Sequence, residues 1–260
     1  MTPVLRAERL TKSFGGVQAV RELSFAFGPG RIQSIIGPNG AGKTTLLNLV
    51  SGVLAPDQGR IWLADQEITR RRPFERARLG LARTFQNLQV FLDMSLRENV
   101  MLGRHRHLER GFWRCLLRTP RVLRSERACR ERADQILRRV GLDGDPDALA
   151  ASLPYGALKR LEIARALATE PRLLLLDEPA AGCNARETAE IDALIQSIAA
   201  EGVTVVLVEH DMRLVMNISD RILVLDHGER LAEGSAAEVR ADPLVIAAYL
   251  GQAAGAGDAA

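Results

Sequence analysis

Short apolar runs alternate with amphipathic segments along much of this 260-residue chain. The first run, Arg31–Ile36, leads into a glycine-rich loop, and a helical pattern follows that ends near Gly52 and Pro56. The apolar positions of this helical pattern are Leu46, Leu47, Leu49, Val50 and Val53. Three later runs have the length of buried strands, and they are Leu173–Leu176, Val203–Val208 and Ile222–Leu225. Because a helical pattern separates the first two of these runs, the order predicts an α/β fold with a parallel sheet.

The middle of the chain differs, because Ser95–Leu142 carries a helical pattern and no strand-like run. Its apolar face is formed by Ala133, Ile136, Leu137 and Val140. We interpret this stretch as a helical subdomain inserted into the α/β core. The predicted organisation is a single domain over 1–260, with a core of about 1–90 and 160–235, a helical subdomain of about 91–159, and a C-terminal helix and tail, 236–260.

The composition is that of a globular protein, with 47% hydrophobic and 26% charged residues. No apolar run approaches the ~18 to 20 residues needed to cross a bilayer, and the opening segment, charged from Arg6 onward, lacks the apolar core of a signal peptide. We therefore expect a soluble, cytoplasmic protein. Its three cysteines, Cys115, Cys129 and Cys183, show no metal-ligand spacing, which disfavours a zinc site or a disulfide framework and fits a reducing compartment.

Positive charge is concentrated in one stretch. Arg104–Arg139 holds 12 Arg against 4 acidic residues, a balance of +8, whereas the whole chain carries +3. Such a block is able to face nucleic acid, anionic lipid or an acidic partner. The alternative is a solvated helical face in a chain whose cations are nearly all arginine, and we favour this alternative.

The strongest chemical signal is a loop between a predicted strand and a predicted helix. It reads Gly37, Pro38, Asn39, Gly40, Ala41, Gly42, Lys43, Thr44 and Thr45, which matches the Walker A pattern in full. Glycines let backbone N–H groups curl around phosphate oxygens, and the N-terminus of the following helix adds a positive dipole. We expect Lys43 to reach the β- and γ-phosphates of ATP and the Thr44 hydroxyl to ligate Mg²⁺. The flanking elements disfavour the alternative, a chance glycine-rich turn.

A second pair of residues strengthens the first signal. The run Leu173–Leu176 ends in Asp177 and Glu178, an arrangement of the Walker B type, in which a strand delivers carboxylates to the edge where α/β proteins bind ligands. Asp177 is expected to hold Mg²⁺, and Glu178 to orient and deprotonate the attacking water. Strands often end in exposed acids, so these two carboxylates are weak evidence alone and become strong evidence together with the Walker A loop. Together they predict a P-loop nucleotide hydrolase.

The order and spacing of these and further motifs resemble the ATP-binding subunits of ABC transporters along nearly the whole chain. This resemblance implies an α/β P-loop NTPase core with a parallel sheet, an N-terminal antiparallel β part and an inserted helical subdomain. It also implies ATP and Mg²⁺ as cofactors.

Three single residues stand where that family has functional side chains. Phe14, within KSFG, is in the place of the aromatic residue that stacks on adenine, although a core or edge-strand Phe is the alternative. Gln86, within RTFQ, resembles the Q-loop glutamine that touches Mg²⁺ and water and couples to the membrane subunit. His210, within EHD, follows a predicted strand and resembles the switch histidine that contacts the γ-phosphate.

The segment Leu153, Pro154, Tyr155, Gly156, Ala157 resembles the ABC signature and stands just before Walker B. The resemblance implies that its backbone amides, at a helix N-terminus, cap the γ-phosphate held by the other subunit of a pair. Pro154 replaces the serine of the commonest form, so a hydroxyl contact is missing, and Ala157 stands where Gln is common. Proline suits the entry to a helix, so we expect the backbone amides still to cap the phosphate. The missing hydroxyl would lower the ATPase rate or the affinity of the two subunits for each other around ATP.

After Walker B, Ala181, Gly182, Cys183 and Asn184 occupy the place of the D-loop, which crosses the dimer interface in this family. Asn184 stands where Asp is common. Cys183 replaces an aliphatic residue, and we expect it to be a small buried hydrophobe rather than a redox group.

Several stretches together resemble one branch, the ATP-binding subunits of bacterial branched-chain amino-acid importers. They are Ala180, Ala181 and Gly182 at the D-loop, VEHDM at 208–212, the signature with Tyr155, the ending AYLG at 248–251, and the Arg-rich insertion from Arg104 to about Ser125. Urea or amide importers and the lipopolysaccharide-export ATPase are close relatives and remain alternatives, although the latter lacks such an insertion.

The branch resemblance implies a set of partners and a location. The partners are a second ATP-binding subunit in a homo- or heterodimer, transmembrane permease subunits and, indirectly, a periplasmic solute-binding protein. The location is peripheral, on the cytoplasmic face of the bacterial inner membrane.

Two rival functions are less well supported. Non-transport ABC ATPases that act on DNA or ribosomes resemble tandem or coiled-coil-bearing chains, whereas this chain has a single Walker A loop and no heptad run, so no nucleic acid is expected. A non-catalytic regulatory module is disfavoured by the presence of Glu178 and His210.

Overall fold

The computed structural model describes residues 2–105 and 120–255. It divides into two compact units. The first unit comprises Met1–Arg83, Arg172–Glu178 and Ile195–Ala260, and the second comprises Thr84–Pro171 and Pro179–Leu194. Part of the Arg-rich segment, 106–119 with Cys115, lies outside the described residues.

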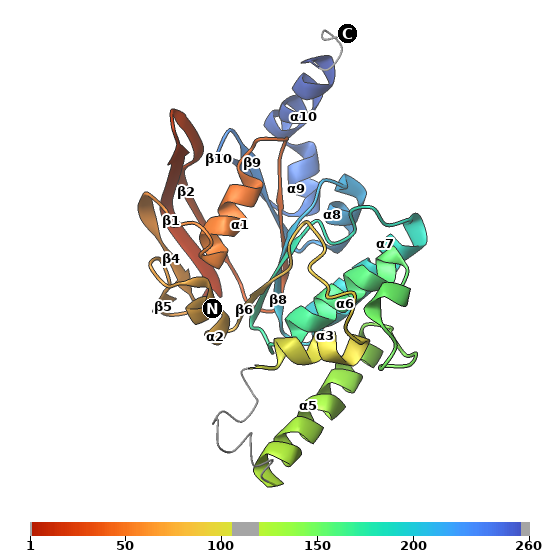
Figure 1. Ribbon diagram of the computed structural model, residues 1–260. Coiled ribbons are helices and arrows are strands. Elements are labelled where there is room, and N and C mark those ends of the chain that lie inside the picture. Colours follow the sequence, from red (N-terminus) through yellow and green to blue (C-terminus); the bar gives the residue numbers. More distant parts are fainter. Residues whose placement is uncertain (1, 106–119, 256–260) are drawn as a thin grey trace. The chain divides into compact units, whose positions relative to one another are not determined.

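The first unit contains two sheets (Figure 1). The antiparallel sheet has the order β2-β1-β4-β5, and its strands are β1 (Leu5–Phe14), β2 (Val17–Phe27), β4 (Gln58–Leu63) and β5 (Gln66–Glu67). The other sheet has the order β10-β9-β3-β8-β7-β6, with the strands β10 (Glu229–Gly234), β9 (Arg221–Asp226), β3 (Ile32–Ile36), β8 (Thr204–Val208), β7 (Leu173–Asp177) and β6 (Leu81–Arg83). From β9 to β6 all neighbours are parallel, and β10 joins one edge antiparallel. The predicted α/β class with a parallel sheet is confirmed, and the edge strand β6 is one that the hydrophobic pattern did not predict.

The helix α1 (Lys43–Ser51) lies between the two sheets (Figure 1). Its buried leucines share one core cluster with Leu5 and Phe27 of the antiparallel sheet and with Leu175 and Val206 of the parallel sheet. The helix stops at Gly52, whose φ of 81° is left-handed. Val53, which the pattern placed on the helical face, therefore lies beyond the helix and is 52% exposed.

Helices also cover the other face of the parallel sheet. They are α8 (Met212–Ile218), α9 (Ala236–Ala241) and α10 (Pro243–Gly255). A second core cluster joins Val215, Val239 and Val245 of these helices to Ile36 of β3 and Val224 of β9. Within 2–105 and 120–255, no helix combines the length and the apolar character that a membrane span requires. The short helix α2 (Pro73–Arg78) completes this unit.

The second unit is helical. Its elements are α3 (Leu96–Gly103), α5 (Pro120–Arg139), a 3₁₀ turn (Ala150–Ser152), α6 (Tyr155–Leu167) and the first part of α7 (Ala185–Ala200). The start of α3 carries a capping box, in which Ser95 and Glu98 exchange side-chain-to-backbone hydrogen bonds. Helix α5 buries Cys129, Ala133, Ile136 and Leu137, while its outer face is rich in exposed arginine.

The C-terminal end of α1 is closed by Arg76, a buried cation from α2. Its guanidinium donates to the carbonyl oxygens of Leu49 (2.6 Å) and Val50 (2.7 Å) in the last turn of α1, and to those of Thr69 (3.0 Å) and Arg71 (2.9 Å). Burial lowers the pKa of Arg76 to about 10, so the group stays charged at neutral pH. Because α1 has no basic residue in its own last turn, Arg76 supplies the positive charge that a helix C-terminus favours.

We predict that Arg76→Met lowers the free energy of unfolding by about 3 kcal/mol, because several buried carbonyl groups lose a charged donor while the apolar stem is kept. Urea unfolding of the full chain measures this change. The matched control is Arg78→Met, which removes an exposed arginine from the same helix and should shift the value by less than ~0.5 kcal/mol. Equal losses in the two variants would contradict the capping role.

Candidate functional site

The loop between β3 and α1 is held in a shape that two of its positions reach only as glycine. Gly37 has a φ of +153°, and a Cβ there would lie 2.1 Å from the carbonyl oxygen of Leu225. Gly42 has a φ of +97°, and a Cβ there would lie 2.3 Å from the carbonyl oxygen of Ala19. The loop backbone is therefore packed tightly against β9 and β2, with no room for a side chain at either glycine.

The first turn of α1 is open to an anion. Gly42 is its N-cap and supplies no side-chain cap, and the first turn has no acidic residue. Its backbone N–H groups thus keep the partial positive charge of a helix N-terminus. Thr44 is exposed at this end, and Asn39 and Gly40 in the loop are exposed as well.

Lys43 lies over the loop that it belongs to. Its Nζ donates to the carbonyl oxygens of Gly37 (2.7 Å) and Pro38 (2.9 Å). Burial lowers the pKa of Lys43, and the negative charges of Glu178 and Asp177 oppose that shift. The ammonium group therefore lies within the electrostatic reach of both carboxylates that the sequence singled out.

Asp177 ends β7 and forms a buried ion pair. Its Oδ2 lies 3.0 Å from Nη2 of Arg83, and both side chains are 5% exposed. Nη1 of Arg83 also donates to Asn48 Oδ1 (2.7 Å) and Ser51 Oγ (2.9 Å) on α1. One guanidinium thus joins the end of β6 to α1 and to the end of β7. Sequence reasoning gave Arg83 no role, because nothing local marks a pair between residues this far apart.

Glu178 and His210 follow neighbouring strands. β7 and β8 are parallel and pair Asp177 with Val208, so both chain segments emerge at the same edge. Glu178 has a φ of 49°, a left-handed conformation that is costly for this residue type, and its N–H donates to the Val208 carbonyl oxygen at 2.9 Å. Strain of this kind, held by the fold, is common at functional sites.

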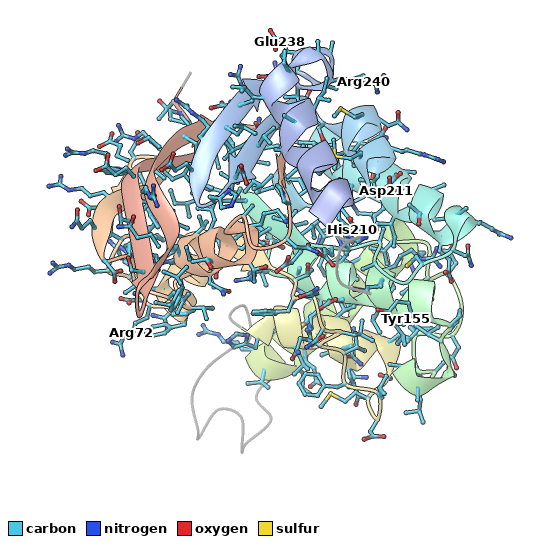
Figure 2. The ribbon with its side chains drawn as sticks, turned by 90° about the horizontal axis from the view of Figure 1, so that it is seen from above. Arg72, Tyr155, His210, Asp211, Glu238 and Arg240 are labelled. Carbon is cyan, nitrogen blue, oxygen red and sulfur yellow. The ribbon has the colours of Figure 1, made fainter. Side chains whose placement is uncertain are left out.

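The His210 imidazole reaches into the same region. Its Nδ1 lies 3.8 Å from Glu178 Oε1 and 3.7 Å from Oε2 of the buried Glu209. His210 sits directly before Asp211, which caps α8 by accepting N–H groups of its first turn (Figure 2). The cap anchors the residue after His210, while the imidazole itself stays 65% exposed and free to meet a ligand.

The oxygen ligands at this edge fit a magnesium ion. The Thr44 hydroxyl and the Asp177 carboxylate are the hard oxygen ligands that Mg²⁺ prefers, and Mg²⁺ usually takes only one or two carboxylates together with substrate phosphates. The described residues contain no group of three or more His, Cys, Asp or Glu side chains placed to hold a metal ion.

Phe14 lies at the tip of the β1–β2 hairpin and is 46% exposed. Nζ of Lys12 lies 5.6 Å from its ring centroid and is paired with Asp57 Oδ1 at 2.7 Å. An exposed ring does not fit the alternative of a core phenylalanine.

Tyr249 of α10 is a residue that sequence reasoning used only as a branch marker. Its side chain packs against the cluster that contains Ile36, directly before the loop. Burial raises the pKa of Tyr249, and the backbone N–H of Gly37 opposes that shift. The C-terminal helix therefore contacts Gly37, the first residue of the loop between β3 and α1.

The remaining predicted residues belong to the second unit. The main-chain oxygen of Gln86 accepts from Lys159 Nζ at 3.5 Å. α6 begins at Tyr155, after Leu153 and the N-cap Pro154, and buries Gly156 and Ala157.

The D-loop segment, Ala181 to Asn184, lies just before α7 in the same unit. Cys183 is partly exposed there, which differs from the buried position expected, because the turn that precedes a helix N-terminus covers it incompletely.

Comparison with known proteins gives consistent matches. Residues 20–181 match the family described as "ABC transporter", and residues 229–255 match "Branched-chain amino acid ATP-binding cassette transporter". The high-affinity branched-chain amino acid transport ATP-binding protein BraF of Pseudomonas aeruginosa is 45% identical, covering 96% of this chain and 99% of that protein. Its counterpart LivG of Escherichia coli is 43% identical with the same coverage. The ADP conformation of an ATP-binding cassette of an ABC transporter superimposes with a TM-score of 0.84 at 32% identity, covering 96% of this chain and 100% of that one.

We predict that Arg83→Met lowers the free energy of unfolding by about 3 to 5 kcal/mol, the range for taking one partner from a buried ion pair. Urea unfolding of the full chain measures the loss. Arg83→Lys is the intermediate control and should lose less stability than the Met variant. It keeps the positive charge, but its ammonium group cannot bridge Asn48, Ser51 and Asp177 as the planar guanidinium does. A Met variant as stable as the parent would show that this ion pair does not support the site.

Proposed function

The chain belongs to the ABC transporter family of ATP-binding proteins, and from this premise we propose that it is the ATP-hydrolysing subunit of a bacterial importer for branched-chain amino acids. The two branched-chain relatives and the match of the C-terminal segment support this solute class. On this proposal the protein lies peripherally on the cytoplasmic face of the inner membrane. Its partners are a second ATP-binding subunit and transmembrane permease subunits, and a periplasmic solute-binding protein delivers the amino acid to them.

The observation that carries the proposal is the convergence of four side chains at one sheet edge. Asp177 ends β7, and Lys43, Glu178 and His210 come after β3, β7 and β8, which lie side by side in the parallel sheet. In parallel sheets the carboxyl ends of the strands form the ligand-binding edge. Phosphate groups would lie on the amides of residues 37–45, and Phe14 would stack on the adenine ring.

Lys43 is held ready for the phosphates. The carbonyl oxygens of Gly37 and Pro38 keep its ammonium over the loop, and the β- and γ-phosphates would take it over with a stronger, charge-assisted interaction. Thr44, Asp177 and Gln86 would hold Mg²⁺, which supplies neutralisation of the phosphate charge when it is bound.

Glu178 would orient the attacking water and accept its proton, and His210 would donate to the γ-phosphate beside it. The separation of 3.8 Å between the two side chains supports their action on one reacting group. The strained backbone of Glu178 supports the same role, because strain that the fold holds in place is common at functional sites.

The second unit would act on the partner subunit. Residues 153–157 would cap the γ-phosphate bound by the partner, and 181–184 would cross the dimer interface. ATP then stabilises the closed pair because it binds that state more tightly, and hydrolysis with product release opens it. The loop around Gln86 and the helices of this unit would transmit closure to the permease.

We predict that Lys43→Ala weakens ATP binding by roughly 10- to 100-fold, the loss expected when a phosphate charge loses a charged hydrogen-bond donor. Calorimetric titration of the isolated subunit measures this. Arg31→Ala is the control, because it removes an equal charge from an exposed ion pair with Asp220 and should leave the affinity unchanged. An unchanged affinity in the Lys43 variant would refute the assignment of the loop.

We predict that Glu178→Gln preserves ATP binding and lowers turnover by ~10² to 10⁴-fold, because the amide keeps the shape but cannot accept the proton. Phosphate release by the assembled transporter gives the rate. When the assembled transporter is reconstituted in vesicles, uptake of labelled leucine, isoleucine or valine should stop. Glu229→Gln, an exposed change on β10, is the control for both assays.

Near-normal turnover in the Glu178 variant would contradict the assignment of Glu178 as the group that accepts the proton. If turnover is lost as expected but the parent transporter moves urea or short amides in place of amino acids, the ATPase assignment stands and the solute class is wrong.

A further inference from the structure

The N-terminus of α6 has no cap of its own. Pro154 occupies the N-cap position with extended backbone and offers no side-chain hydrogen bond, and the first turn of α6 holds no acidic residue. The first N–H groups of a helix need acceptors from outside, and this end also favours negative charge. The acceptor for Gly156 must therefore come from another element.

Glu187 of α7 supplies that acceptor. Its Oε1 accepts the backbone N–H of Gly156 at 3.3 Å. A Cβ built on Gly156 would lie 2.5 Å from Cδ and 2.6 Å from Oε1 of Glu187, so the carboxylate rests directly on the glycine. One formal negative charge thus occupies the positive end of α6.

The same carboxylate also holds the D-loop segment. Its Oε2 accepts the N–H of Asn184 at 3.0 Å, and Asn184 Oδ1 accepts the N–H groups of Arg186 and Glu187 at 3.0 Å each. This reciprocal arrangement is a capping box at the start of α7. Glu187 therefore closes the N-termini of two helices at once.

A second contact links the two segments. The ring of Tyr155 packs over Gly182, because a Cβ on Gly182 would lie 3.0 Å from Tyr155 Cε1. Figure 2 shows the Tyr155 side chain at the start of α6. Within the second unit, the start of α6 and the D-loop segment therefore have to move together or break both contacts.

We propose that Glu187 is a positioning residue that holds the Gly156 amide until the γ-phosphate on the partner subunit displaces it, which rests on the trans-acting role given above to residues 153–157. The Gly156 amide has one hydrogen, so it cannot serve both acceptors fully. The carboxylate and the phosphate carry like charge, so each opposes the other at the same helix end. Closure of the pair then requires Glu187 to leave the Gly156 amide, which removes one of the two contacts between the start of α6 and the D-loop segment.

The test uses ATP-driven dimerisation of the full chain in the Glu178→Gln background, followed by size exclusion with light scattering. Glu187→Gln removes the charge, while its amide oxygen still accepts the Asn184 N–H and keeps α7 capped. We expect the ATP concentration for half-maximal dimerisation to fall by about 3- to 10-fold, which is the effect on affinity expected from one charge at a helix terminus. An unchanged or higher ATP requirement would overturn the proposal.

Glu190→Gln is the matched control. Glu190 lies one turn further along α7 and pairs with Arg160 of α6 and Arg186, away from the Gly156 amide. It should leave the ATP requirement within about 2-fold of the background, because its charge does not lie at the N-terminus of α6. If the Glu190 and Glu187 variants shift dimerisation equally, Glu187 acts only by holding α6 to α7, and the proposal falls.

A further variant separates failure of this inference from failure of the proposed function. Gly156→Asp places a fixed negative charge at the helix end and should block dimerisation while the monomer still binds ATP. If that variant dimerises normally, residues 153–157 do not act in trans, and both proposals fail. If it blocks dimerisation and Glu187→Gln behaves like the background, the trans role stands and the role of Glu187 is refuted.

A kinetic measurement in the assembled transporter with intact Glu178 gives an independent readout. Glu187→Gln should lower the KM for ATP by the same 3- to 10-fold factor with kcat changed by less than about 2-fold, because the charge acts on closure and not on the chemical step. A merely structural role would lower kcat or stability without lowering KM, and that result would overturn the proposal.

Discussion

The structure depends on one helix whose two ends have opposite requirements. On the proposed function the N-terminus of α1 has to stay open, because its N–H groups would form the phosphate cradle, and Gly42 is indeed an N-cap without a side chain. The stability that a capped helix would have is restored elsewhere. Arg76 closes the carbonyl end, Arg83 ties its side to β6 and β7, and the leucines of α1 are buried between two sheets. Each of these contacts holds the open end in place without touching it.

A second helix N-terminus obeys the opposite rule. α6 also presents amides that the proposed mechanism uses for phosphate, but here Glu187 covers Gly156. On the proposed function, the difference follows from where the phosphate comes from. α1 would bind the phosphates of the nucleotide held by its own subunit and keeps Lys43 beside its open end, whereas α6 would meet a phosphate held by the partner subunit. An uncapped N-terminus would make α6 less stable while no phosphate is bound. The Glu187 carboxylate is suited to accept its N–H groups during that time.

Local pattern alone was enough for the class of fold and for the main chemistry. The strand-length runs predicted the central strands, because strands buried on both faces are continuously apolar. The loop before α1 was recognisable because its conformation demands glycine at particular places, and Gly37 and Gly42 do have conformations and neighbours that exclude a side chain. Asp177 and Glu178 stood out because they come directly after the apolar run Leu173–Leu176. The family resemblance rests on the same short motifs.

Tertiary structure decided what no short window encodes. The Arg83–Asp177 pair spans 94 residues, and the contact of Glu187 with Gly156 spans 31. An arginine in the sequence is by default a solvated cation, and only burial among carbonyl groups turned Arg76 into a helix cap. By itself, the sequence determined where the backbone must bend, where it is buried and which reactive groups end the strands, because these are needs of a few consecutive residues. Which charges meet, and which helix end is open or covered, follows from packing between distant segments, where desolvation makes each pairing strong and specific.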